Sequence, residues 1–74
     1  KGIRVNAIAP GWIVTDLNRD YLASEQGAAI QREIPAGRFG KPVEVADMIL
    51  YLASSASDLV CGQDILIDGG YTAR

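Results

Sequence analysis

The chain has 74 residues, of which 49% are hydrophobic and 22% charged, a composition typical of one small folded unit or of a piece of one. The net charge of −2 with scattered basic residues argues against a nucleic-acid partner, and no apolar run reaches the ~20 residues of a membrane span, so we expect a cytoplasmic protein. The absence of histidine excludes His-based catalysis and the usual zinc sites, so no metal is expected, and the single Cys61 allows no internal disulfide.

The first half of the chain predicts one strand and two short helices. Apolar residues alternate over residues 3–9 and a Pro-Gly pair follows, which predicts a β-strand that ends in a turn. Residues 16–34 have a weak helical pattern with a glycine in the middle and a proline after it. We therefore expect two short surface helices there, at about residues 17–24 and 26–33.

The second half predicts a long helix and a short strand. Pro42 suits the first helical position, and apolar residues recur every three or four positions over residues 42–53. This helix is apolar around most of its circumference, so we expect residues 43–53 to be buried only by a longer chain or a second subunit. A last strand is predicted over residues 64–68. The order strand, helix, strand predicts a parallel pair with a right-handed connection.

The segment after the first strand is the best candidate for a binding site, because ligands of open α/β sheets bind at the carboxyl ends of the strands. Thr15 offers a hydroxyl there, and the backbone around Ile13 offers amide groups. Two interpretations of Thr15 remain open. It either contacts a polar ligand or caps a helix that begins at Asp16.

Other polar residues are better explained by structure than by chemistry. Asp16 and Asp20 are expected on a solvated helix face rather than as a catalytic pair. The loop around Arg38 superficially resembles a phosphate-binding loop but lacks its hydroxyl residue, so Arg38 is expected to be structural. Cys61, with no histidine and no evident cation to activate it, is expected to be a buried small hydrophobe.

Four blocks of sequence resemble the short-chain dehydrogenase/reductase family, in the family's order and with its spacing. They are residues 2–11 (Gly-Ile-Arg-Val-Asn-Ala-Ile-Ala-Pro-Gly) followed by Thr15, residues 35–46, residues 52–57 and residues 62–70. The resemblance covers essentially the whole chain. It implies an α/β fold, namely the C-terminal part of a Rossmann-type doubly wound parallel sheet with two strands, lid helices and one long buried helix.

The resemblance also implies part of a site for NAD or NADP. Pro10 and Gly11 would shape the turn after the first strand. Ile13 would make backbone contacts to the nicotinamide carboxamide, and Thr15 would hydrogen-bond the carboxamide or a phosphate. These roles are carried over from the family and do not follow from spacing alone.

Two further expectations come from the resemblance. Residues 16–34 would form the variable lid over a small alcohol or carbonyl substrate, with Trp12 and Leu17 as walls of the pocket. Residues 43–53 and 64–68 would form the interface of a homo-oligomer, either a tetramer, as is typical of the family, or a dimer.

The family's glycine-rich dinucleotide fingerprint and its catalytic Ser and Tyr-x-x-x-Lys group are absent from these 74 residues, and Lys1 is not that lysine. The whole chain, 1–74, is therefore expected to be the C-terminal segment of an NAD(P)-dependent oxidoreductase that interconverts a secondary alcohol and a carbonyl. Alone it is predicted to be inactive. The alternative is a non-catalytic fragment that acts as an assembly or interaction module.

Overall fold

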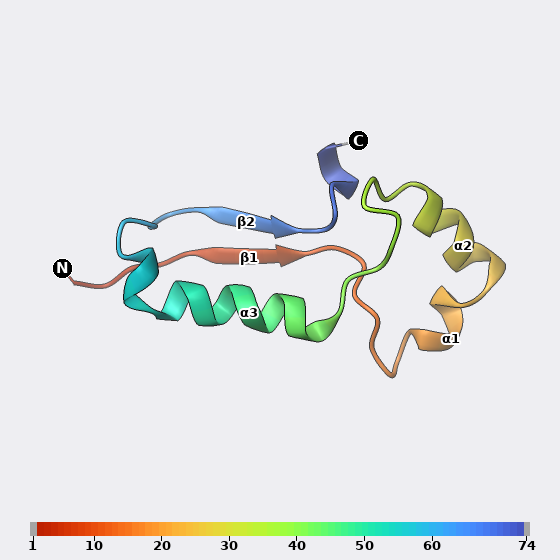
Figure 1. Ribbon diagram of the computed structural model, residues 1–74, viewed down its shortest axis with the longest axis horizontal. Helices are drawn as coiled ribbons and strands as arrows, with labels where there is room; N and C mark the ends of the chain where they lie inside the picture. Colours follow the sequence, from red (N-terminus) through yellow and green to blue (C-terminus); the bar gives the residue numbers. More distant parts are fainter. Residues whose placement is uncertain (1, 74) are drawn as a thin grey trace.

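The computed structural model describes residues 2–73, arranged as two parallel strands beside a long helix, with two short helices at one end (Figure 1). The molecule is elongated and flat, with extents of 49 × 26 × 15 Å. In chain order the elements are β1 (Ala7–Pro10), α1 (Arg19–Leu22), α2 (Glu25–Arg32), α3 (Pro42–Ala53), a 3-10 turn (Ser55–Ser57), β2 (Asp64–Ile67) and a second 3-10 turn (Tyr71–Ala73).

The strands β1 and β2 pair in parallel, with Ala7 opposite Asp64 and Pro10 opposite Ile67. The pairing continues one residue further, because the N–H of Gly11 donates to the carbonyl of Ile67 at 3.0 Å. The carboxyl ends of both strands therefore lie side by side, where the chain turns towards the short helices (Figure 1).

The first strand is shorter than the alternation predicts, since it begins at Ala7 and not at residue 3. Opposite its expected first half lies a turn that contains Gly62, whose φ of 73° is in the left-handed region. Only one backbone hydrogen bond, from the N–H of Gly62 to the carbonyl of Val5, joins the two segments there. Alternation thus marks an extended segment, and only its second half finds a strand to pair with. The last strand, expected over 64–68, ends at Ile67.

The helix α3 spans the residues that the sequence predicts, whereas α1 and α2 are shorter or displaced relative to the predicted 17–24 and 26–33. Gly27 lies buried in the first turn of α2. A Cβ on Gly27 would come within 2.0 Å of the carbonyl oxygen of Leu22. Glycine is therefore required here so that the backbone of α1 can pack against α2.

The guanidinium of Arg4 joins the start of the chain to the end of α3. One of its nitrogens donates to the carbonyl of Leu52 at 2.9 Å and lies 3.4 Å from that of Ser54. The other donates to the carbonyls of Ser57 at 3.0 Å and Val60 at 3.2 Å. Helix ends leave carbonyls without partners, and Arg4 satisfies several of them at once.

Little apolar surface is buried within the described residues, where the buried hydrophobic side chains are Leu22 and Ile34, 5% and 4% exposed. No residue of α3 is buried, and Leu50 and Leu66 remain 70% and 57% exposed. The radius of gyration of 14.5 Å exceeds the ~11 Å expected of a compact domain of this length. The apolar sides of α3 and β2 thus lie open in this chain by itself.

Replacing Arg4 tests whether its hydrogen bonds hold the fold. We expect Arg4→Ala to lower the free energy of unfolding of the full-length protein by about 2–3 kcal/mol, because several carbonyls lose a charged donor. Arg4→Lys should recover only part of that loss, since a single ammonium group cannot replace the two guanidinium nitrogens that donate to these carbonyls. Urea denaturation measures the effect. Arg19→Ala, which removes only an exposed ion pair with Asp16, is the control and should cost less than about 1 kcal/mol. Equal effects at the two positions would contradict the assignment.

Candidate functional site

The segment from Gly11 to Thr15 leaves the carboxyl end of β1 under a tight steric constraint. A Cβ on Gly11 would lie 2.4 Å from the Cβ and 2.9 Å from the Cα of Asp68, the residue that follows β2. No larger residue fits at this position without separating the two strand ends. Gly11 therefore sets how closely the loop after β1 follows the end of β2.

The loop is next held on one side by the backbone of Gly40. The N–H of Gly40 donates to the carbonyl of Trp12 at 2.8 Å, and the N–H of Val14 donates to the carbonyl of Gly40 at 3.0 Å. These two bonds form a single parallel bridge between Ile13 and Gly40. The loop that precedes α3 is thus joined to the loop that follows β1.

The side chain of Asn18 holds the same loop through the alternate residues. Its Nδ2 donates to the carbonyl of Ile13 at 2.8 Å, and its Oδ1 accepts from the N–H of Thr15 at 2.7 Å. Neither Asn18 nor Gly40 is among the site residues that the sequence predicts. Asn18 carries a weak signal, since asparagine is favoured just before a helix, whereas nothing in the sequence marks Gly40 as a partner of this loop.

The polar groups of the loop that remain available include one N–H and one hydroxyl expected to bind a ligand. Within residues 2–73, no hydrogen bond is made by the N–H of Ile13 or by the hydroxyl of Thr15. The interpretation of Thr15 as a helix cap is wrong, because α1 begins at Arg19 and its N-cap is Asn18. Residues 16–18 form a turn, in which the carbonyl of Thr15 accepts from the N–H of Asn18 at 3.2 Å, and α1 begins only after this turn.

The two side chains expected to form a substrate pocket lie apart from the hollow beneath the short helices. Leu17 is 100% exposed and Trp12 is half-buried. The hollow, of about 290 Å³, is lined by Val14, Arg19, Leu22, Ala23, Gln31 and Phe39. It shares one residue, Val14, with the loop after β1, so that it opens beside the available groups of that loop.

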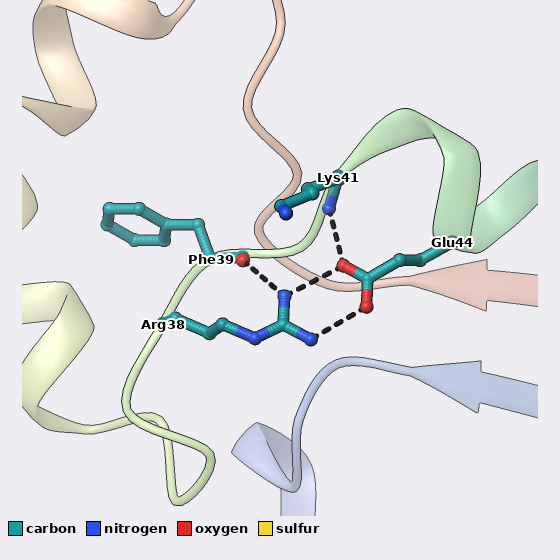
Figure 2. A network of polar contacts seen from close by, with 4 residues as sticks. All are labelled: Arg38, Phe39, Lys41 and Glu44. Atoms are coloured by element: carbon teal, nitrogen blue, oxygen red, sulfur yellow. Dashed lines mark hydrogen bonds and ion pairs between the residues drawn. The ribbon is translucent and has the colours of Figure 1, made fainter.

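An ion pair fixes the approach of the chain to α3 (Figure 2). Both terminal nitrogens of Arg38 donate to the carboxylate of Glu44, at 2.8 and 2.7 Å, and one also donates to the carbonyl of Phe39. The same carboxylate accepts the N–H of Lys41 at 2.8 Å. The hydrogen bonds from Arg38 and from the Lys41 backbone lower the pKa of Glu44 to about 2. Arg38 is therefore a structural residue.

Asp68 orders the chain after β2. Its carboxylate accepts from the hydroxyl of Thr72 at 2.7 Å and from the N–H groups of Thr72 and Gly70 at 3.1 and 3.0 Å. The Thr72 hydroxyl and these N–H groups hold the pKa of Asp68 below its usual value. The carbonyl of Gly69 in turn accepts the N–H of Ala36. The segment after β2 thus contacts both Gly11 and the loop that precedes α3.

The remaining candidates lie at the surface. Cys61 is exposed, which overturns the expectation that it is buried, because it belongs to the turn around Gly62. Asp16 and Asp20 are exposed as expected, and Asp16 pairs with Arg19 at 2.9 Å. In the described part of the chain, no three metal-ligating side chains gather, and no helix is both long and apolar enough to cross a membrane.

The available N–H and hydroxyl suit a small planar amide. A primary carboxamide carries one acceptor oxygen and one NH₂ donor. The N–H of Ile13 can donate to that oxygen, and the hydroxyl of Thr15 can either donate or accept. Both lie on a loop at the carboxyl ends of parallel strands, where dinucleotides bind in open α/β sheets.

Comparison with known proteins establishes the family. A family model described as enoyl-(acyl carrier protein) reductase matches residues 1–72. The chain belongs to the short-chain dehydrogenase/reductase family. It is 53% identical over 70 residues to a 3-oxoacyl-(acyl-carrier-protein) reductase of Thermotoga maritima, which covers 95% of this chain and 28% of that protein.

Two further similarities extend this finding. Over 72 residues the chain is 47% identical to an NAD-dependent glycerol dehydrogenase of Listeria innocua, covering 97% of this chain and 28% of that protein. A putative 2-deoxy-D-gluconate 3-dehydrogenase of Agrobacterium tumefaciens, solved with bound NADP, superposes with a TM-score of 0.89 at 43% identity, covering 99% of this chain and 30% of that one. The chain thus spans less than a third of each of these relatives, and its α/β fold is part of their Rossmann-type fold.

The pKa of Glu44 predicts how stability depends on pH. Because that pKa is lowered on folding, from 4.5 to about 2, the ion pair stabilises the folded state above pH 4.5 and this contribution is lost as pH falls towards 2. Glu44→Gln in the full-length protein should therefore reduce stability at neutral pH and flatten the decline between pH 4.5 and 2. Urea midpoints at a series of pH values measure this.

The partner of Glu44 provides the control for that experiment. Arg38→Gln should flatten the same pH window only in part, since the N–H of Lys41 still donates to Glu44. The double variant should add nothing to Glu44→Gln, because that change already removes the ion pair. An unchanged decline in Glu44→Gln, or additive effects of the two substitutions, would show that the pair does not stabilise the fold.

Proposed function

We propose that the chain is the C-terminal part of an NAD(P)-dependent oxidoreductase that interconverts a secondary alcohol and a carbonyl. The observation that carries this proposal is the pair of available groups on the loop after β1, the N–H of Ile13 and the hydroxyl of Thr15. Family membership and the NAD or NADP in the names of relatives support it. The family's Ser, Tyr and Lys would be supplied by residues outside this chain, so the chain alone is expected to be inactive.

In this proposal the loop binds the nicotinamide end of NAD or NADP. The N–H of Ile13 donates to the carboxamide oxygen, and Thr15 hydrogen-bonds the carboxamide or a phosphate. Pro10 and Gly11 shape the turn that presents these two groups, since only a glycine at position 11 permits the close approach to Asp68. When bound, the cofactor supplies the hydride acceptor or donor. This chain contributes orientation of the nicotinamide ring and no proton transfer.

Residues 16–34, which include α1 and α2, would form the lid over the substrate. Trp12 and Leu17 are proposed as its walls, and the full exposure of Leu17 leaves its side chain open to contact a substrate. The relatives are named for different substrates, namely an acyl carrier protein derivative, glycerol and a sugar acid. The proposal therefore stops at the class of small alcohol or carbonyl compound.

The exposed apolar residues of α3 and β2 support a second role, in assembly. Val43 and Ile49 are more than half exposed, as are Leu50 and Leu66, and an apolar surface of this kind marks an interface. Residues 43–53 and 64–68 would contact the rest of the full-length protein and a second subunit, in a cytoplasmic homotetramer or homodimer. If the chain acts by itself, this surface favours the alternative of an assembly module.

Substitution of Thr15 tests the cofactor site. Because its hydroxyl makes no hydrogen bond within the described chain, Thr15→Ala in the full-length protein should leave the melting temperature unchanged. It should weaken binding of NAD or NADP by about 0.5–1.5 kcal/mol, the net value of one hydrogen bond. Calorimetric titration measures the Kd.

Thr15→Ser keeps the hydroxyl and is the matched control, expected to bind with nearly the wild-type Kd. An unchanged Kd in Thr15→Ala would remove Thr15 from the site. A lowered melting temperature in the same variant would mean that the hydroxyl serves the fold instead.

A further inference from the structure

The side chain of Asn18 does not serve the helix that it precedes. Asn18 is the N-cap of α1, where asparagine ordinarily accepts a hydrogen bond from an N–H of the first turn, yet it makes no such bond. Instead its amide turns back to the carbonyl of Ile13 and the N–H of Thr15, at 2.8 and 2.7 Å. The half-buried side chain is thus committed to the loop after β1.

This arrangement replaces a neighbouring strand by a side chain. The backbone of Gly40 pairs with Trp12 and Val14, and the amide of Asn18 pairs with the alternate residues, Ile13 and Thr15. A side-chain amide carries the same donor and acceptor as a peptide unit, so it can complete the pairing where no strand follows. With both partners in place, the backbone on either side of the Ile13 N–H is held.

We propose that Asn18 is a positioning residue for the nicotinamide end of the cofactor. It acts through Ile13 and Thr15, which it holds so that the N–H of the first and the hydroxyl of the second already face the ligand before binding. A preorganised loop loses less conformational freedom on binding, which raises affinity without any contact between Asn18 and the ligand. This inference rests on the proposed function and adds to it a residue that holds the loop without contacting the ligand.

The chain contains a matched control for a purely structural role. Asn6, at the other end of β1, makes the same pair of bonds, donating from Nδ2 to the carbonyl of Val60 at 3.0 Å and accepting from the N–H of Gln63 at 3.1 Å. Like Asn18 it is half-buried. Asn6→Ala thus removes an equivalent pair of bonds away from the candidate site.

The experiment compares two ligands in the full-length wild type, Asn18→Ala and Asn6→Ala. The first ligand is NADH or NADPH, whichever the wild type binds more tightly, because the reduced ring is uncharged. The second is the matching ADP-ribose or its 2′-phosphate, which lacks the nicotinamide. We expect Asn18→Ala to raise the Kd of the reduced cofactor about tenfold, with the Kd of the ADP-ribose ligand unchanged. Asn6→Ala should lower the melting temperature and change neither Kd.

Each other result has a distinct meaning. An unchanged cofactor Kd in Asn18→Ala, or an equal rise for both ligands, overturns the positioning role and leaves the proposed function intact. A wild type that binds the cofactor no better than the ADP-ribose ligand overturns the proposed function and this inference together. Should Asn18→Ala not fold, Asn18→Asp keeps the acceptor for Thr15 and loses the donor to Ile13. Asn18→Asp should then raise the Kd of the reduced cofactor by a smaller factor and leave the Kd of the ADP-ribose ligand unchanged. An unchanged Kd of the reduced cofactor in this variant would overturn the inference.

Discussion

The parallel pairing of β1 with β2 is the interaction on which the rest of the structure depends. It joins residues more than fifty positions apart, and both ends of the pair carry further contacts. At the amino end, Arg4 and Asn6 donate to carbonyls in the last turn of α3 and in the segment after it. At the carboxyl end, Gly11 lies against Asp68 so closely that no side chain fits between them. Without this register, the loop after β1 would have no fixed place relative to the segment after β2.

The candidate site is built from backbone held by polar contacts and not from a packed core. Gly40 and Asn18 satisfy alternate residues of the loop, and the N–H of Ile13 and the hydroxyl of Thr15 are among the groups left for a ligand. Buried apolar contacts are few in the described residues, so local order here comes from hydrogen bonds. Such order is modest by itself, since each bond contributes only about 0.5–1.5 kcal/mol. The apolar sides of α3 and β2 are exposed in the described residues and contribute little to this order.

Sequence patterns could predict the elements whose causes are local. The bounds of α3 follow from Pro42 and the helical spacing of its apolar residues, and the parallel order of the strands follows from the helix between them. The start of β1 could not be predicted, because alternation does not show whether an extended segment has a partner. The exposure of Cys61 depends on the turn around Gly62, and the residue type alone does not show that cysteine lies in such a turn.

The candidate site was only partly predictable for the same reason. Thr15 and Ile13 could be singled out, since they follow a strand and match the family's motif. The partners of these residues could not be predicted. Gly40 is more than twenty residues away from Ile13, and the side chain of Asn18 bonds the preceding loop instead of the helix that it precedes. Whether Thr15 caps a helix or stays available depends on where α1 begins, and the turn at residues 16–18 decides that.

A crystal structure of the full-length protein with its nicotinamide cofactor tests the proposed cofactor site most directly. We expect the carboxamide oxygen within about 2.7–3.2 Å of the Ile13 nitrogen. We also expect the hydroxyl of Thr15 to contact the same ligand and both hydrogen bonds of Asn18 to be retained. A carboxamide held by other residues, with the N–H of Ile13 facing solvent, would contradict the proposed site.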